Sequence, residues 1–342
     1  MHVGVDSFVS TVTDPATERV VGAQERIEHL LAEIALADAA GLYSFGIGEH
    51  HREEYYDSAP PILLAAAAAQ TSRIRLNSAV TVLSAADPVR VFQQFATLDL
   101  VSGGRIDLVV GRGSFTEAFP LFGLDLADYD SLFAEKLDLL LAIRESTHVT
   151  WSGRHRPALT GQGVYPRPVQ DPLPIWVGVG GTPESFVRAG LLGLPLMVAI
   201  IGGEPRRFAP LVELYRRAGA EAGHSPDRLR VGLHVFGFVG DSVQSAADTI
   251  YPGWHEMFTK VSRERGFPPP SRAQFDLTSG PDGAFFLGDP DTVAGKLRRV
   301  SQQLGGLDRV SIQMTNTRLA HADLLRGIEL LGTEVAPRVT DV

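Results

Sequence analysis

Eight short apolar runs, each followed by a segment with helical periodicity, place the strongest constraint on how this 342-residue chain folds. The runs are rich in Val, Ile and Leu and bounded by turn residues, so we interpret them as strands. Eight strand–helix units without a break in composition predict an α/β protein, a single (β/α)8 (TIM) barrel domain over residues 1–342. The predicted strands are residues 3–8, 44–48, 74–83, 106–111, 174–178, 196–201, 230–239 and 310–314. The predicted helices are residues 26–40, 61–70, 88–101, 126–145, 182–192, 205–222, 291–304 and 319–331.

Two stretches rich in glycine and proline are predicted insertions, near residues 147–171 and 241–288. A barrel of this kind needs roughly 250 residues, so about 90 must lie outside it. The second stretch follows the seventh strand, on the edge where barrels bind ligands, and such long connections commonly act as lids. Its aromatic residues would cover a substrate or pack the insertion onto the barrel, and we favour packing. They are Trp254, Phe258, Phe285 and Phe286.

Composition excludes several classes of function. Lys and Arg total 31 against 40 Asp and Glu, and the net charge of −9 argues against a nucleic-acid or anionic-membrane partner. The chain has no cysteine, which excludes disulfides, thiolate nucleophiles and cysteine-ligated zinc or iron–sulfur centres. Residues 2–6 fit a first strand better than a signal peptide, and no apolar run approaches the roughly 20 residues that span a bilayer. We therefore expect a cytoplasmic protein.

An acid/base cluster follows the second predicted strand, where Glu49, His50 and His51 come directly after Gly48. Parallel α/β folds place chemistry at the carboxyl ends of strands, and histidine changes charge most easily near neutral pH. The three residues are candidate acid/base groups, metal ligands or parts of a hydrogen-bonded loop. A metal site would need ligands from other strand ends; the first strand ends without histidine, and His234 alone keeps this weaker alternative open.

Two glycine-containing loops are candidate phosphate sites. Arg112 lies between Gly111 and Gly113 after the fourth strand, where an arginine can make charge-assisted bonds to a phosphate. Residues 178–182 join the fifth strand to a helix for which Thr182 is the predicted N-cap, and free N–H groups at a helix start suit an anion. The alternative for both loops is an ordinary tight turn.

Small and polar residues occupy the third strand at 77–81, where bulky apolar residues would be expected. Small side chains there allow a flat ring to lie against the backbone, or they fill a tapering barrel core. The segment includes Ser78, Ala79 and Val80.

Taken together, these segments resemble those of the bacterial-luciferase-like, flavin-dependent monooxygenases, the luciferase-like monooxygenase superfamily. The resemblance covers nearly the whole chain in the same order. It rests on GEHH at 48–51, NSAVTVLSAADPVRVFQQFATLDLVSGGRIDLVVGRGS at 77–114, FPLFGLDLADYDSLFAEKLDLLLAI at 119–143 and IWVGVGGTPESFVRAG at 175–190. In this family the fold is a (β/α)8 barrel whose long insertion after strand seven is a mobile lid.

The resemblance implies roles for individual residues. His50 matches the catalytic base, flanked by Glu49 and His51 in the same motif. Ala79 and Val80 match a pair joined by a non-prolyl cis peptide against which the isoalloxazine ring packs, beside Ser78. Arg112 matches an arginine that binds the flavin phosphate, and the loop with Gly178, Gly180, Gly181 and Thr182 matches the family's phosphate loop. Luciferases carry a reactive cysteine where this chain has Gly111, so light emission is not expected.

The implied activity is a monooxygenase in which reduced FMN reacts with O2, through a flavin C4a-(hydro)peroxide, to oxygenate a small organic substrate. Reduced FMN would come from a separate flavin reductase or be formed with NAD(P)H, and related barrels imply a homodimer. Two alternatives remain open: an F420-dependent oxidoreductase that transfers hydride, and a non-catalytic flavin-binding protein. A metal-dependent barrel hydrolase is a third and weaker one.

Overall fold

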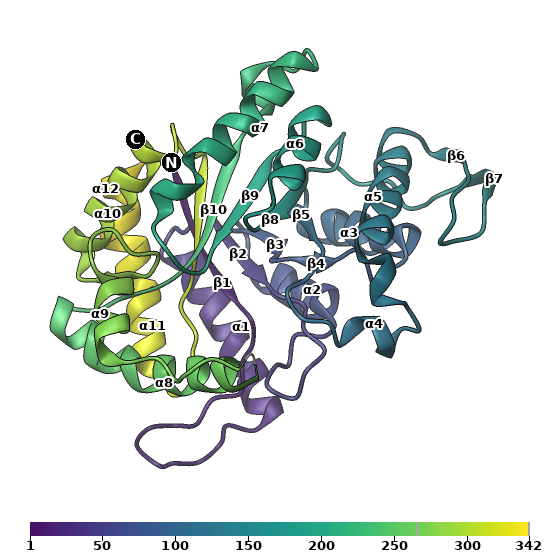
Figure 1. Ribbon diagram of the computed structural model, residues 1–342. Helices are drawn as coiled ribbons and strands as arrows, with labels where there is room; N and C mark the ends of the chain where they lie inside the picture. The colour runs from purple at the N-terminus through teal and green to yellow at the C-terminus, as the bar shows by residue number, and fades with distance from the viewer. Residues whose placement is uncertain (265, 341–342) are drawn as a thin grey trace.

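A closed barrel of eight parallel strands forms the centre of the protein in a computed structural model that describes residues 1–264 and 266–340 (Figure 1). Successive strands are hydrogen-bonded neighbours, and β12 pairs with both β10 and β1, which closes the barrel. The predicted (β/α)8 fold is therefore confirmed. The strands are β1 (His2–Ser7), β2 (Ser44–Ile47), β3 (Arg75–Ser78), β5 (Ile106–Gly111), β8 (Ile175–Val179), β9 (Leu196–Ile200), β10 (Val231–Val239) and β12 (Arg309–Gln313).

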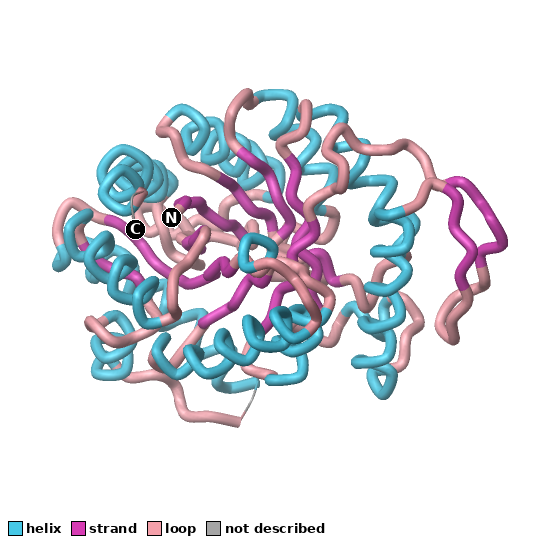
Figure 2. Tube along the Cα trace, turned by 90° about the horizontal axis from the view of Figure 1, so that it is seen from above, coloured by secondary structure: helices cyan, strands magenta, loops and turns pink. Residues whose placement is uncertain are grey.

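Helices surround the strands, as the view from above shows (Figure 2). Their ends agree with the predicted ones within four residues, because capping residues lie where the periodicity stops. At the start of α3, for example, the Asp87 carboxylate accepts bonds from the N–H groups of Val89 and Arg90, and Pro88 occupies the first turn. The helices are α1 (Ala23–Ala39), α2 (Pro60–Gln70), α3 (Pro88–Ser102), α5 (Tyr129–Glu145), α6 (Pro183–Leu191), α7 (Ala209–Glu221), α10 (Pro290–Gln303) and α11 (His321–Leu330), with short α4 (Ala118–Leu121) and α12 (Ala336–Val339). No helix within the described residues combines the length and the apolar character needed to cross a bilayer.

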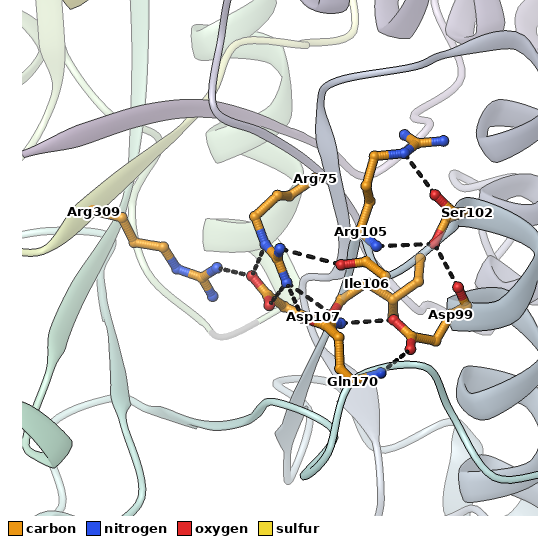
Figure 3. A network of polar contacts seen from close by, with 9 residues as sticks. Arg75, Asp99, Ser102, Arg105, Ile106, Asp107, Gln170 and Arg309 are labelled. Carbon is orange, nitrogen blue, oxygen red and sulfur yellow. Dashed lines mark hydrogen bonds and ion pairs between the residues drawn. The ribbon is translucent and has the colours of Figure 1, made fainter.

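The amino ends of the strands are closed by a buried ionic network (Figure 3). The carboxylate of Asp107 accepts from Arg75 at 2.6 Å and from Arg309 at 2.8 Å. The guanidinium carbon of Arg309 also lies 3.8 Å from the ring centroid of Trp176, inside the barrel. Two arginines satisfy one buried carboxylate, so this end of the barrel is filled and the opposite end carries the cavity.

The third predicted strand, residues 74–83, is two strands rather than one. β3 ends at Ser78, and β4 (Thr81–Val82) pairs with β5 further along. The chain leaves the ladder at Ala79 and Val80, whose peptide bond is cis, as the family resemblance implies. The single-strand prediction is wrong because the ladder is interrupted between Ser78 and Thr81.

Both predicted insertions are folded segments. Residues 147–171 include an antiparallel hairpin of β6 (His148–Trp151) and β7 (Leu159–Gly163), which projects to the right in Figures 1 and 2. Residues 241–288 include α8 (Val243–Glu264), α9 (Arg272–Ser279) and β11 (Phe286–Gly288), which pairs with the end of β10. Only the second insertion reaches the cavity described next.

Candidate functional site

A cavity of about 540 Å³ opens at the carboxyl ends of the barrel strands. Its wall includes all the predicted site residues except His51 and Gly181. The predicted residues that line it are Glu49, His50, Ser78, Ala79, Val80, Arg112, Gly178, Gly180 and Thr182. The structure thus brings together residues from four strand ends that are up to 133 positions apart, from Glu49 to Thr182.

His50 is held by a buried carboxylate. Its Nδ1 lies 2.8 Å from Oδ2 of Asp57, and its backbone N–H donates to Oδ1 at 3.1 Å. Burial raises the pKa of Asp57, although the bonds from His50 oppose this effect. A carboxylate only accepts, so Nδ1 carries the proton and Nε2 is the acceptor on the cavity side. Gly48 is required here, because a Cβ would lie 2.7 Å from Asp57 Oδ2 and 3.0 Å from the His50 ring.

Glu49 and His51 have different surroundings from His50. Glu49 lines the cavity, but one of its oxygens accepts from the N–H of Val82 at 2.9 Å and the other lies 3.2 Å from Nε2 of His51. His51 packs against Phe122, with ring centroids 5.1 Å apart, outside the cavity wall. These contacts give Glu49 and His51 a role in fixing the loop that carries His50.

Val80 forms a ledge on the cavity wall. A Cβ added at Gly111 would lie 2.7 Å from Val80 Cγ2, and one added at Gly178 would lie 2.7 Å from Cγ1. Both methyl groups therefore fill notches left by glycines on β5 and β8. Behind the ledge, the Ser78 hydroxyl donates to the carbonyl of Val109 at 2.8 Å and accepts from its N–H at 3.1 Å. Ser78 is thus bonded within the barrel wall.

Arg112 faces the start of α6. Its Nη2 lies 3.3 Å from the Ser185 hydroxyl and 3.5 Å from the Thr182 hydroxyl, while Nη1 pairs with Asp130. Thr182 is the N-cap and Pro183 follows it, as predicted, but the Thr182 hydroxyl accepts no backbone N–H. Added Cβ atoms at Gly180 and Gly181 would meet nothing within 4 Å, so the loop backbone is open to a ligand. Guanidinium, hydroxyls and helix N–H groups together suit an anion.

A second histidine–carboxylate pair lies in the same cavity. Nδ1 of His234, on β10, is 2.7 Å from Oδ2 of Asp6, on β1. Phe8 contacts both histidine rings, with centroids 4.7 Å from His50 and 5.7 Å from His234. The two pairs therefore share one aromatic neighbour.

Aromatic residues dominate the outer part of the cavity. Tyr55 stacks on His50 with ring centroids 4.4 Å apart, and burial raises the pKa of Tyr55 to about 12. From the second insertion, α8 contributes Met257, Phe258 and Val261 to the wall. The packing interpretation holds for three of the four predicted insertion aromatics, which are buried; Phe258 alone lines the cavity. The three are Trp254, Phe285 and Phe286.

Sequence reasoning missed several site residues, among them Asp57, Asp6 and Tyr55. Asp57 follows His50 by seven positions in a polar loop, where an aspartate is usually a turn residue. Asp6 is charged within an otherwise apolar strand, a signal that could have been used. In residues 1–264 and 266–340, no group of three or more His, Asp or Glu side chains could hold a metal ion.

Comparison with known proteins shows the family. A family profile described as luciferase-like monooxygenase matches residues 5–307. The 4-hydroxyprotoasukamycin monooxygenase of Streptomyces nodosus subsp. asukaensis is 31% identical over 320 residues, which cover 88% of this chain and 84% of that protein.

Solved structures share the fold. The monooxygenase RslO1 from Streptomyces bottropensis has a TM-score of 0.84 at 23% identity, covering 98% of this chain and 99% of that one. The oxygenating constituent of 3,6-diketocamphane monooxygenase from Pseudomonas putida, in complex with FMN, has a TM-score of 0.76 at 21% identity, covering 99% of both chains. An F420-dependent secondary alcohol dehydrogenase also reaches 0.76, at 18% identity and with 99% and 98% covered. The profile match and the full-length relative show that the chain belongs to the luciferase-like monooxygenase family and is an enzyme of that family.

Proposed function

We propose that this enzyme is a monooxygenase that uses reduced FMN and O2 to oxygenate a small organic substrate. The observation that carries the proposal is the joint placement of His50, the Val80 ledge and the Arg112 site in one cavity. Bound reduced flavin would supply the activated oxygen. The protein's own part is to hold the cofactor, exclude water and handle the proton.

The residues fit a flavin mononucleotide. Arg112, the open backbone at Gly180 and Gly181, and the start of α6 would hold a terminal phosphate. The ledge of Val80, with no side chain at Gly111 or Gly178 beside it, would support a flat ring. The FMN-bound relative of the same fold supports FMN as the cofactor.

His50 would hold or accept the proton at Nε2. Asp57 fixes the tautomer and stabilises the charge if the ring becomes protonated. The insertion helix α8 would act as a lid, because its apolar residues Met257, Phe258 and Val261 face the cavity. Reduced FMN would be delivered by a separate reductase or formed with NAD(P)H, and assembly as a homodimer stays a prediction.

The test replaces His50 and keeps its neighbour as the control. In His50→Ala we expect FMN to bind as in the wild type, measured by quenching of flavin fluorescence, while oxygenated product falls by about 10²–10⁴-fold. The substrate is one chosen with the wild type from a panel of phenols and ketones, supplied with reduced FMN and O2. His51→Ala, outside the cavity wall, should keep more activity. Undiminished product formation in His50→Ala would refute the proton-handling role.

A cofactor titration separates the alternatives. Tight binding of F420 with no affinity for FMN would favour hydride transfer over oxygenation. Binding of reduced FMN without any faster oxygen consumption in the presence of a bound substrate would favour a flavin-binding protein without chemistry.

A further inference from the structure

The cavity has two chemically distinct regions. If FMN lies on the Val80 ledge with its phosphate at Arg112, as proposed above, the remaining wall is largely aromatic. Its aromatic residues are Phe8, Tyr55, Phe115, Phe236 and Phe258, and the two histidines also line it. Aromatic walls favour flat ring compounds, which stack at little entropic cost. This inference about the substrate rests on the proposed function.

His234 is the polar group of this region that the proposed oxygenation does not use. Its Nδ1 bonds to Asp6 at 2.7 Å, so the proton lies on Nδ1 and Nε2 is a free acceptor. No described residue makes a hydrogen bond to that Nε2. The ring is fixed by Phe8, nearly parallel at 20°, and by Phe236 at a centroid distance of 6.3 Å.

Polar side chains also line this cavity. Three side-chain oxygens of cavity residues are buried without a hydrogen-bond partner in the described structure: Asp6 Oδ1, Asn77 Oδ1 and Gln313 Oε1. These three oxygens are covered by protein, and the amide groups of Asn77 and Gln313 donate to Ser78 and Thr315. The acceptor that stays available to a ligand is Nε2 of His234, and the group that matches it is a donor such as an O–H.

We propose that the substrate is a ring compound with an acidic hydroxyl, a phenol or an enol, which donates to Nε2 of His234. The proton passes from the hydroxyl to Nε2: the O–H bond breaks, an N–H bond forms, and both electrons of the O–H bond stay on oxygen. Asp6 remains a carboxylate and stabilises the imidazolium. The oxyanion raises the electron density of the ring, which prepares its carbon atoms for attack by an electrophilic oxygen donor.

The experiment uses 4-nitrophenol, whose ionised form has its own absorption band, and its methyl ether 4-nitroanisole, which has no proton to give. Both are titrated into protein loaded with oxidised FMN, at a pH where free 4-nitrophenol is mostly protonated. We expect the wild type to bind the phenol at least about ten-fold more tightly than the ether, with the band of the phenolate. His234→Asn should lose this preference and keep its affinity for the ether, and Asp6→Asn should weaken the phenolate band.

The controls keep the outcomes separate. Phe258→Leu, a change in the apolar wall, should weaken phenol and ether alike. Equal binding of phenol and ether by the wild type would overturn the proposal without any variant, as would an unchanged preference in a folded His234→Asn protein. Tighter binding of a ketone analogue such as 4-nitroacetophenone would also overturn it. Failure of the wild type to quench FMN fluorescence would instead count against the proposed function.

Discussion

The contacts of Val80 with the glycines of β5 and β8 allow a sharp test of how the Val80 ledge is built. Gly111 and Gly178 leave space for the two methyl groups of Val80, and a Cβ at position 111 would lie 2.7 Å from Cγ2 and 3.3 Å from Cβ of Val80. The other methyl group of Val80 packs against Gly178, where an added Cβ would lie 2.7 Å from Cγ1. We therefore expect Gly111→Ala to displace the Val80 side chain.

The magnitude follows from the two opposing effects of the replacement. Overpacking a tight contact costs about 1–3 kcal/mol. Removing a glycine from the unfolded chain stabilises by about 0.4–1 kcal/mol where the backbone permits it, and position 111 has no positive φ. We expect Gly111→Ala to lower the free energy of unfolding by about 1–2 kcal/mol. Displacing the ledge should also weaken FMN binding about ten-fold.

Urea unfolding and FMN fluorescence titration measure the two effects. Gly180→Ala is the matched control, because its Cβ would meet nothing within 4 Å, and its stability should be unchanged or slightly higher. Val80→Ala removes the clash, so the double variant should recover about 1 kcal/mol relative to additivity. Equal stability of Gly111→Ala and Gly180→Ala, or strict additivity in the double variant, would refute this account. The same contact explains why the luciferase cysteine has no room at this position.

Two further predictions concern the insertion. Arg52 bonds to Glu54, Glu117 and Glu264, and so ties the end of α8 to loops at the cavity mouth; its bonds lower the pKa of Glu54 to about 2. Arg52→Gln should speed tryptic cleavage near the end of α8 several-fold, and high salt should do the same in the wild type. Arg272→Gln on α9 is the control and should leave the cleavage rate unchanged. Equal cleavage rates for Arg52→Gln and the wild type would show that these ion pairs do not hold the end of α8. Lys296 donates to three carbonyls, and burial lowers its pKa to about 7. Above pH 7 the unfolded chain then binds more protons than the folded one, so the free energy of unfolding of the wild type should rise by about 1–3 kcal/mol toward pH 9. The urea midpoint of Lys296→Met should lack that rise. The same pH dependence in both proteins would show that the hydrogen bonds to the carbonyls cancel the effect of burial on the Lys296 pKa.

The fold could be predicted because each strand–helix unit carries its own local signals. Residues 106–111 match β5 at both ends, since a run that is apolar except for Asp107 stops at a glycine before Arg112. The ends of α3 could also be predicted, from Pro88 at its start and from the glycines after Ser102 at its end. The helices of the second insertion were not predicted, because their apolar residues are divided between the barrel and the cavity.

The candidate site was predictable only in part, for a physical reason. His50, Val80 and Arg112 lie at strand ends, where position alone indicates function. The carboxylates that bond to the site histidines, in contrast, come from segments that only the folded structure brings together. Asp57 reaches His50 from a loop, and Asp6 reaches His234 across 228 positions, so neither pairing is encoded in a local pattern.

The ionic network of Arg75, Asp107 and Arg309 affects how ligands enter and leave the cavity. It fills the amino end of the barrel, whereas the cavity lies at the carboxyl end, where α8 contributes to its wall. Reduced flavin, oxygen and substrate would then share a single passage with the departing product. Binding and release would then be ordered, because the molecule that binds deepest in the cavity must enter first and leave last.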